Sequence, residues 1–157
     1  MPDAPLILCY DGSDDAKHAI QRGSDLLTRR RALVLTVWLP TGALGAGLGF
    51  TANAVSFAEV DRAAAEAGAR IAEEGVQLAR DAGLDAEPVA VKAGGPIWHA
   101  IVEMADRCDA AAIVMGSRGL TGLRSMLLGS VSGGVVHHAD RPTLVIRRPG
   151  EDDSRAA

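Results

Sequence analysis

The sequence predicts a single α/β domain in which an open sheet of five parallel strands is covered by helices on both faces. Short apolar runs alternate with longer segments of helical periodicity along the whole chain. This alternation is typical of parallel sheets, whose strands are buried on both faces and joined by right-handed helical crossovers. The length of 157 residues and the hydrophobic content of 48% suit one domain with a sizeable core.

The first half of the chain supplies two strands and two helices. Leu6 to Tyr10 is continuously apolar, as in a buried strand, and Asp11 to Asp14 ends it with a turn and helix caps. A helix is predicted from Asp14 to Arg30, and Ala32 to Trp38 is the second strand. Phe57 to Ala82 is a long amphipathic helix. Its inner face is expected to hold Phe57, Val60, Ala64, Ala67, Ile71, Leu78 and Ala82.

A glycine-rich loop, residues 39–56, separates the second strand from the long helix. Loops of this length are usually functional or disordered, and we expect a mobile flap. Gly47, Gly49 and Ala52 fit a dinucleotide-binding fingerprint. That fingerprint must follow its strand directly and open a helix, whereas several loop residues intervene here. We therefore do not assign dinucleotide binding to this loop.

The second half of the chain supplies three strands and two helices. Ala86 to Lys92 is the third strand, and Pro96 to Arg107 is a helix with proline at its first position. Ala110 to Met115 is the fourth strand, Val131 to Ala139 a short helix, and Thr143 to Arg147 the last strand.

The composition excludes several classes of protein. A net charge of −4 and a pI near 5.5 argue against nucleic-acid binding, which usually requires a basic face. No apolar run reaches the length of a membrane span, and the first ten residues lack a secretory signal, so we expect a cytoplasmic protein. Cys9 and Cys108 are expected to be structural thiols. The small polar residues 150–157 are expected to form a disordered tail after a domain spanning 1–149.

The most distinctive stretch lies between the fourth strand and the short helix. Gly116 and Gly119 stand where the strand ends, and Gly129 and Ser130 stand where the helix begins. Glycine lets backbone N–H groups approach an anion closely, and a helix start adds unpaired N–H groups. The pattern predicts a phosphate-binding loop, and the alternative is an ordinary glycine-rich surface turn.

Three polar side chains in this region can assist anion binding. Arg118 and Arg124 can offset phosphate charge, and Ser130 can cap the helix or donate to a phosphate oxygen. Asp11, at the end of the first strand, is placed to accept hydrogen bonds from ribose hydroxyls. Its alternative role is to accept the backbone N–H groups of its own turn.

The spacing of these glycines resembles the ATP-binding signature of the universal stress protein family. That signature is a glycine, two residues, a glycine, nine residues and a Gly-Ser pair, as in Gly116 to Ser130. Leu6 to Ser13 is similar to the family's first strand and its aspartate, and Val135 to Arg147 to its last helix and strand. The resemblance covers about residues 5 to 148.

This resemblance implies a Rossmann-like sheet with the strand order 3-2-1-4-5, in which Asp11 and Gly116 flank one crevice. It implies ATP as the ligand, with Mg²⁺ held through the ATP phosphates, and a backbone contact from Val37 to the adenine edge. It also implies a homodimer formed through Thr143 to Arg147. The implied ATP-binding residues are Tyr10, Asp11, Val37, Met115, Gly116, Arg118, Gly119, Gly129, Ser130, Val131 and Ser132.

Catalytic and metal-binding motifs are missing from the sequence. There is no G-x-x-x-x-G-K-[ST] loop, no H-E-x-x-H and no paired C-x-x-C. The adjacent His137 and His138 point about 100° apart on a helix, so we expect one packed and one exposed imidazole. No base can be named for a Ser130 nucleophile. We expect a nucleotide-responsive regulatory module in stress response rather than an enzyme. A slow ATPase or phosphoryl or adenylyl transferase remains the alternative, and a nucleotide-free interaction protein a third.

Overall fold

The structure, a computed structural model, describes residues 4–27, 31–40, 54–119 and 128–149. Its elements are β1 (Leu6–Cys9), α1 (Asp14–Leu26), β2 (Arg31–Trp38), α3 (Ala54–Asp81), β3 (Asp85–Lys92), α4 (Ile97–Arg107), β4 (Ala112–Gly116), α5 (Ser130–His138) and β5 (Thr143–Ile146). The predicted tail, Arg124 and most of the glycine-rich loop of residues 39–56 lie outside the described residues.

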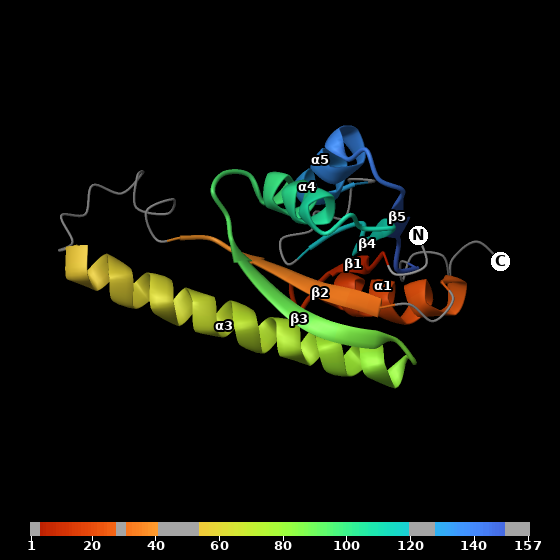
Figure 1. The fold of residues 1–157 in the computed structure, drawn as a ribbon, viewed down its shortest axis with the longest axis horizontal. Coiled ribbons are helices and arrows are strands. Elements are labelled where there is room, and N and C mark those ends of the chain that lie inside the picture. The colour runs from red at the N-terminus through yellow and green to blue at the C-terminus, as the bar shows by residue number, and fades with distance from the viewer. Residues whose placement is uncertain (1–3, 28–30, 41–53, 120–127, 150–157) are drawn as a thin grey trace.

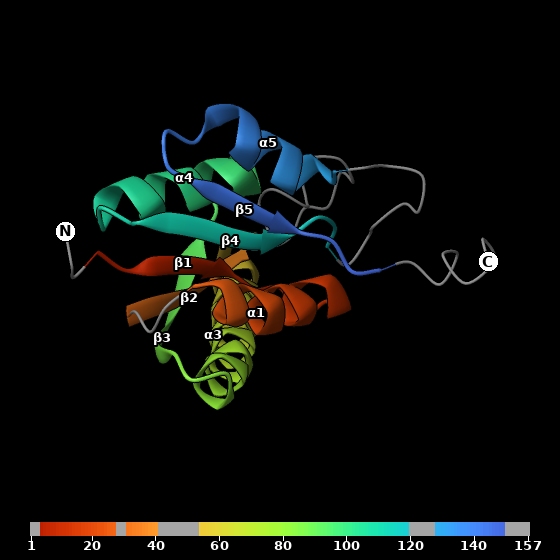
Figure 2. The same cartoon turned by 90° about the vertical axis from the view of Figure 1, so that its right-hand side faces the viewer.

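The five strands form one parallel sheet in the order β3-β2-β1-β4-β5, which confirms the predicted fold class. The order reverses between β1 and β4, and β3 and β5 are the edges. Helices α1 and α3 cover one face of the sheet, and α4 and α5 cover the other (Figures 1 and 2). A ligand crevice is therefore expected where β1 and β4 diverge at their carboxyl ends.

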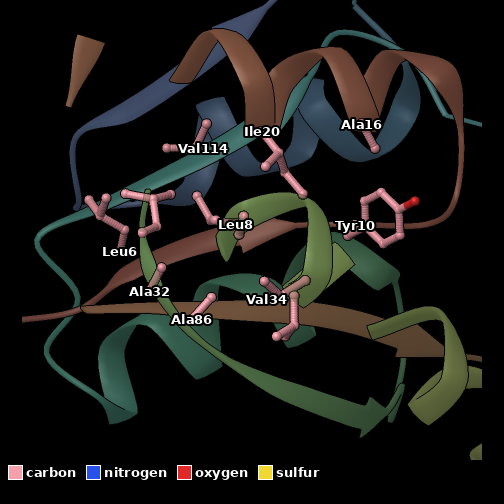
Figure 3. Close-up of a cluster of buried hydrophobic side chains, with 12 residues drawn as sticks. Leu6, Leu8, Tyr10, Ala16, Ile20, Ala32, Val34, Ala86 and Val114 are labelled. Atoms are coloured by element: carbon pink, nitrogen blue, oxygen red, sulfur yellow. The ribbon is translucent and has the colours of Figure 1, made fainter. Parts of the chain in front are cut away.

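Each face of the sheet has its own apolar core because side chains alternate along the strands. Leu6 and Leu8 of β1 point toward α1 and α3, where they pack with Ile20 and other buried residues (Figure 3). Ile7 points the other way and packs with Ile101 of α4 and the residues around it. The apolar runs of β1, β2 and β4 are thus strands buried on both faces, whereas the run of β5 is half-buried.

Helix α1 ends earlier than predicted, at Leu26 instead of Arg30. Its final hydrogen bond runs from the Leu27 N–H to the Gly23 carbonyl, and Leu27 itself is extended, with φ −111° and ψ 123°. Arg31 already belongs to β2, where it pairs in register with Asp85.

The predicted inner face of α3 is only partly right, because Ile71 and Leu78 pack against the core but other residues are buried more deeply. The residues of α3 that are buried against the sheet are Gly68, Ala72, Gly75, Val76 and Ala79, while Val60 is 47% exposed. Gly75 faces the sheet and lies so close to it that a Cβ there would be 2.7 Å from both the Tyr10 ring and the Val34 side chain. In Figure 1 the N-terminal part of α3 extends beyond the strands.

Candidate functional site

Asp11 and Gly119 meet just beyond the carboxyl ends of β1 and β4. Asp11 Oδ1 accepts the Ser13 N–H at 3.0 Å, so the turn role of this carboxylate is present. The second oxygen, Oδ2, faces Gly119 at close range: a Cβ on that glycine would lie 2.7 Å from Oδ2. One carboxylate oxygen thus holds the turn while the other points at the glycine loop.

The two glycine turns of the loop also lie next to each other. Ser117 follows β4, and its carbonyl accepts both the Gly129 N–H and the Ser132 hydroxyl, each at 2.8 Å. The Ser117 N–H donates to the Ile146 carbonyl at the end of β5, at 3.1 Å. The chain that leaves β4 after Gly116 is therefore back beside Ser117 when it reaches Gly129.

Helix α5 begins at this junction without a side-chain cap. Gly129 is its N-cap residue, and Ser130 is the first helical residue and exposed. Of the two roles considered for Ser130, capping is therefore wrong, and donation to a phosphate oxygen stays a prediction. The first intrahelical bond runs from the Gly133 N–H to the Gly129 carbonyl. The N–H groups of Ser130, Val131 and Ser132 consequently have no acceptor within the helix, and the positive end of its dipole opens toward the loop.

Arg118 places an unsatisfied donor beside this helix start. Its side chain is 20% exposed, yet its Nε is buried and has no hydrogen-bond partner among the described residues. The nearest carboxylate oxygen, Asp15 Oδ2, lies 3.9 Å away. Because an unpaired buried donor is costly, an anionic oxygen at this position would be favourable.

The glycine at position 116 has a packing role. A Cβ there would lie 2.9 Å from the Asp15 carbonyl carbon and 3.0 Å from its oxygen. Gly116 therefore lets the first turn of α1 close against β4. At Gly129 a Cβ would make only ordinary contacts, the nearest at 3.4 Å to the Ser117 carbonyl oxygen. Among the three glycines of the motif, Gly119 is the one whose missing side chain keeps space open beside Asp11.

The apolar residues of the predicted site lie on one face of the sheet, with one exception. Val37, Met115 and Val131 belong to the core between the sheet and α4 and α5. Tyr10 points to the other face, where it is buried and its hydroxyl donates to Glu74 Oε1 at 2.6 Å. Tyr10 can therefore serve the site only through its backbone.

Burial, together with the hydrogen bond to Glu74 and its charge, raises the pKa of Tyr10. Because the pKa of Tyr10 is higher in the folded chain, the protonated hydroxyl contributes to the free energy of unfolding. An unfolded tyrosine ionises near pH ~10, so this contribution is complete below that pH and is lost as the pH rises above it. Tyr10 is the only tyrosine in the chain. We expect its tyrosinate absorbance to appear only together with alkaline unfolding, whereas the urea-denatured chain titrates near pH ~10. Tyrosinate near that pH in a chain with native circular dichroism would contradict this.

The thiols and imidazoles outside the crevice show no sign of reactive chemistry. Cys9 and Cys108 are free, and burial, followed by the charge of Asp11, raises the pKa of Cys9 to about 12, which keeps it protonated. His137 and His138 are both exposed, although the His138 ring stacks on Trp98 with centroids 4.0 Å apart. The expectation of one packed imidazole is met only by that stacking.

The described residues hold no group of three or more His, Cys, Asp or Glu side chains arranged to bind a metal ion. No helix within the same ranges has the length and apolar character needed to cross a membrane.

Two polar residues at this edge of the sheet were missed by sequence reasoning. Ser117 is fully buried, and its hydroxyl donates to Asp15 Oδ2 at 3.3 Å. Asp15 is one of two adjacent aspartates at the start of α1, and nothing in the sequence distinguishes it from the exposed Asp14. Only the closure of α1 against β4 brings it to the loop.

The sequence is similar to those of known proteins. The sequence pattern of the Universal stress protein family matches residues 5–147. Universal stress protein YxiE of Bacillus subtilis is 38% identical over 80 residues, which cover 51% of this chain and 53% of the relative. The chain thus spans about half the length of this curated relative.

Solved structures share the fold at low sequence identity. The structure of MJ0577 from Methanocaldococcus jannaschii has a TM-score of 0.78 at 22% identity, covering 96% of this chain and 100% of that one. A universal stress protein family member from Arabidopsis thaliana, solved with AMP bound, has a TM-score of 0.61 at 19% identity, covering 98% and 96%. With the family pattern matched along nearly the whole chain, the protein belongs to the universal stress protein family.

Proposed function

We propose that this protein is an ATP-binding universal stress protein that acts in the cytoplasm as a dimeric, nucleotide-responsive regulatory module in stress response. One juxtaposition supports the proposal above all others: Asp11 Oδ2 faces Gly119 beside the uncapped start of α5. An acceptor for hydroxyl groups and a set of anion donors are thereby combined at one edge of the sheet. The free thiols Cys9 and Cys108 suit a reducing compartment.

The groups at this edge fit the three parts of ATP. Asp11 Oδ2 suits the ribose hydroxyls, and the Arg118 Nε and the N–H groups at the start of α5 suit the phosphates. The Leu35 carbonyl of β2 accepts the Tyr10 N–H and so points toward the chain of β1. Backbone groups repeat their direction every two residues along a strand, so those of Val37 point the same way, just beyond the end of β1. That position suits the adenine edge.

Magnesium would enter with the nucleotide. Mg²⁺ keeps several waters and binds readily through substrate phosphates, so a dedicated protein site is not required for it to accompany ATP. In the proposed complex, ATP with its Mg²⁺ orders the segment after β2 or biases the dimer surface. Hydrogen exchange at Leu39 and in β5 that stays unchanged with saturating MgATP would contradict this output.

A binding role is favoured over catalysis by the surroundings of Ser130. This residue is exposed, and within the described ranges no side-chain base is hydrogen-bonded to its hydroxyl. An activated nucleophile normally needs such a base. Linear turnover of ATP that disappears on substitution of Gly119 would instead support the slow ATPase or transferase alternative.

The proposed dimer forms through β5. This strand is an edge of the sheet, and its Leu144, Val145 and Ile146 are only half-buried within one chain. Exposed apolar edges favour pairing with another strand. We propose that the segment Thr143 to Arg147 pairs with its copy across a two-fold axis, and a solution mass equal to one chain would count against it.

The Asp11→Asn variant tests the proposed nucleotide site. Asparagine keeps an oxygen for the Ser13 N–H but places a donor where Oδ2 stood, so it loses the acceptor for ribose hydroxyls. Because hydrogen bonds to charged groups contribute ~1.5–3 kcal/mol, we expect ATP binding to weaken by ~10–100-fold in calorimetry, with the melting temperature unchanged. The exposed Asp25→Asn variant, on α1 and far from the loop, is the matched control. Wild-type affinity in Asp11→Asn would mean that Asp11 serves only the turn.

A further inference from the structure

Asp15 lies between two arginines at the edge of the candidate site. Its Oδ2 is 3.9 Å from the Arg118 Nε, and its Oδ1 is 3.7 Å from the Arg148 Nε. Both distances allow Coulomb attraction but exceed hydrogen-bond length. The Asp15 and Arg118 side chains are only 13% and 20% exposed, so solvent screens this pair weakly, whereas the charge of Arg148, which is 51% exposed, is screened more.

The carboxylate is fixed in this position by its neighbours. The first turn of α1 closes on Gly116, where any side chain would meet the Asp15 backbone. The Ser117 hydroxyl donates to Asp15 Oδ2 at 3.3 Å. Arg148, which follows β5, also pairs with the exposed Asp14 at 3.0 Å. Asp15 is therefore a buried anion shared by an arginine of the loop and an arginine beyond the sheet edge.

We propose that Asp15 is the counter-ion that restrains Arg118 and thereby limits the affinity of the site for polyphosphate. Arg148 acts in the opposite sense, because it attracts the same carboxylate and leaves Arg118 freer to face a ligand. This inference rests on the proposed nucleotide site. If the inference holds, the strength of phosphate binding depends on Arg148, which follows β5, the proposed dimer strand.

The direction of the effect follows from the charges. A phosphate that satisfies the Arg118 Nε brings negative charge close to Asp15, which cannot move away because α1 is packed on Gly116. The resulting repulsion grows with the charge on the ligand. Removing the carboxylate charge should therefore strengthen the binding of ATP more than that of AMP. A residue that merely supported the fold would not change this ratio.

Calorimetric titration of the full chain with MgATP and with AMP tests the proposal. We expect Asp15→Asn to bind ATP about fivefold more tightly and AMP less than about twofold more tightly. Asp14→Asn removes the same charge one residue away, from a carboxylate that contacts Arg148 but not Arg118, and should change neither affinity by more than about twofold. Asp15→Glu, which keeps the charge, should stay near the wild-type ratio.

Arg148→Gln supplies the second arm of the experiment. We expect it to weaken ATP binding about twofold in the wild-type chain and to have no effect in the Asp15→Asn background. A direct contact of Arg148 with phosphate would act equally in both backgrounds and would overturn the shared-anion account.

The outcomes separate this inference from the proposed function. A wild-type chain that binds neither nucleotide overturns both. A wild-type chain that binds ATP, with an unchanged or weakened Asp15→Asn variant, overturns only the role of Asp15, and so does an equal gain in Asp14→Asn. If Asp15→Asn loses its helical circular dichroism, Asp15→Ser repeats the test, because serine is well tolerated at a helix start.

Discussion

Gly119→Val is expected to abolish ATP binding, with a loss of at least ~100-fold, while the sheet stays folded. The Cβ alone would lie 2.7 Å from Asp11 Oδ2, so valine must displace the carboxylate proposed to hold the ribose. Its methyl groups would also occupy the space beside the phosphate donors. Gly119 is exposed and lies beyond the end of β4, so the core does not depend on it. Calorimetry measures the affinity, and thermal unfolding followed by circular dichroism measures the fold.

Gly95→Val is the matched control. It makes the same substitution in another turn between a strand and a helix, at a residue where a Cβ would meet nothing within 4 Å. We expect both its ATP affinity and its melting temperature to equal those of the wild type. If Gly119→Val also bound ATP with wild-type affinity, the assignment of the site to this edge of the sheet would be wrong.

Gly75→Val should cause the largest loss of stability, about 3 kcal/mol in the free energy of unfolding. The Cβ would lie 2.7 Å from the Tyr10 ring and from the Val34 side chain, both of which are buried and held by the sheet. Helix α3 must therefore move away from the strands, and valine is itself unfavourable in a helix. Urea denaturation measures the change.

The exposed Ala69 of the same helix provides the comparison. Ala69→Val introduces the same side chain on the solvent face and should cost only a few tenths of a kcal/mol. Equal losses in the two variants would show that the effect comes from helix propensity and not from the contact of α3 with the sheet.

Much of the fold could be predicted because the strands are buried on both faces. A run such as Leu6 to Tyr10 is continuously apolar, so it can be recognised as a buried strand without an alternation of apolar and polar residues. Glycine and proline mark the ends of such runs. The strand order could not be obtained this way, since periodicity does not say which strands are neighbours. It came from the resemblance to a family, and the sheet confirms it.

Two of the differences have one physical origin, which is close approach between elements. The predicted inner face of α3 left out Gly75, where the helix lies so near the sheet that only glycine fits. Asp15 had no signal for the same reason, because its position depends on how closely α1 approaches Gly116. Of the two roles considered for Ser130, capping α5 is taken by the preceding glycine. Sequence patterns indicate which residues are apolar, and backbone distances decide which of them touch.

The site was predicted to the extent that its residues follow strand ends. Asp11 and Gly116 were expected to flank one crevice, and the structure brings Asp11 next to Gly119, three residues further along the same loop. Tyr10 was included in the same set, but strand alternation sends its side chain to the opposite face, where it contacts Glu74. That outcome could have been foreseen from the alternation along β1.

The central claim, that this crevice binds ATP, is tested most directly by native mass spectrometry of the full chain with added MgATP. The account predicts one ATP adduct per chain, and that nucleotide should be recovered intact on denaturation. A chain that carries no nucleotide when purified and gains none on addition of ATP would contradict it, and the glycine loop would then be only a surface turn.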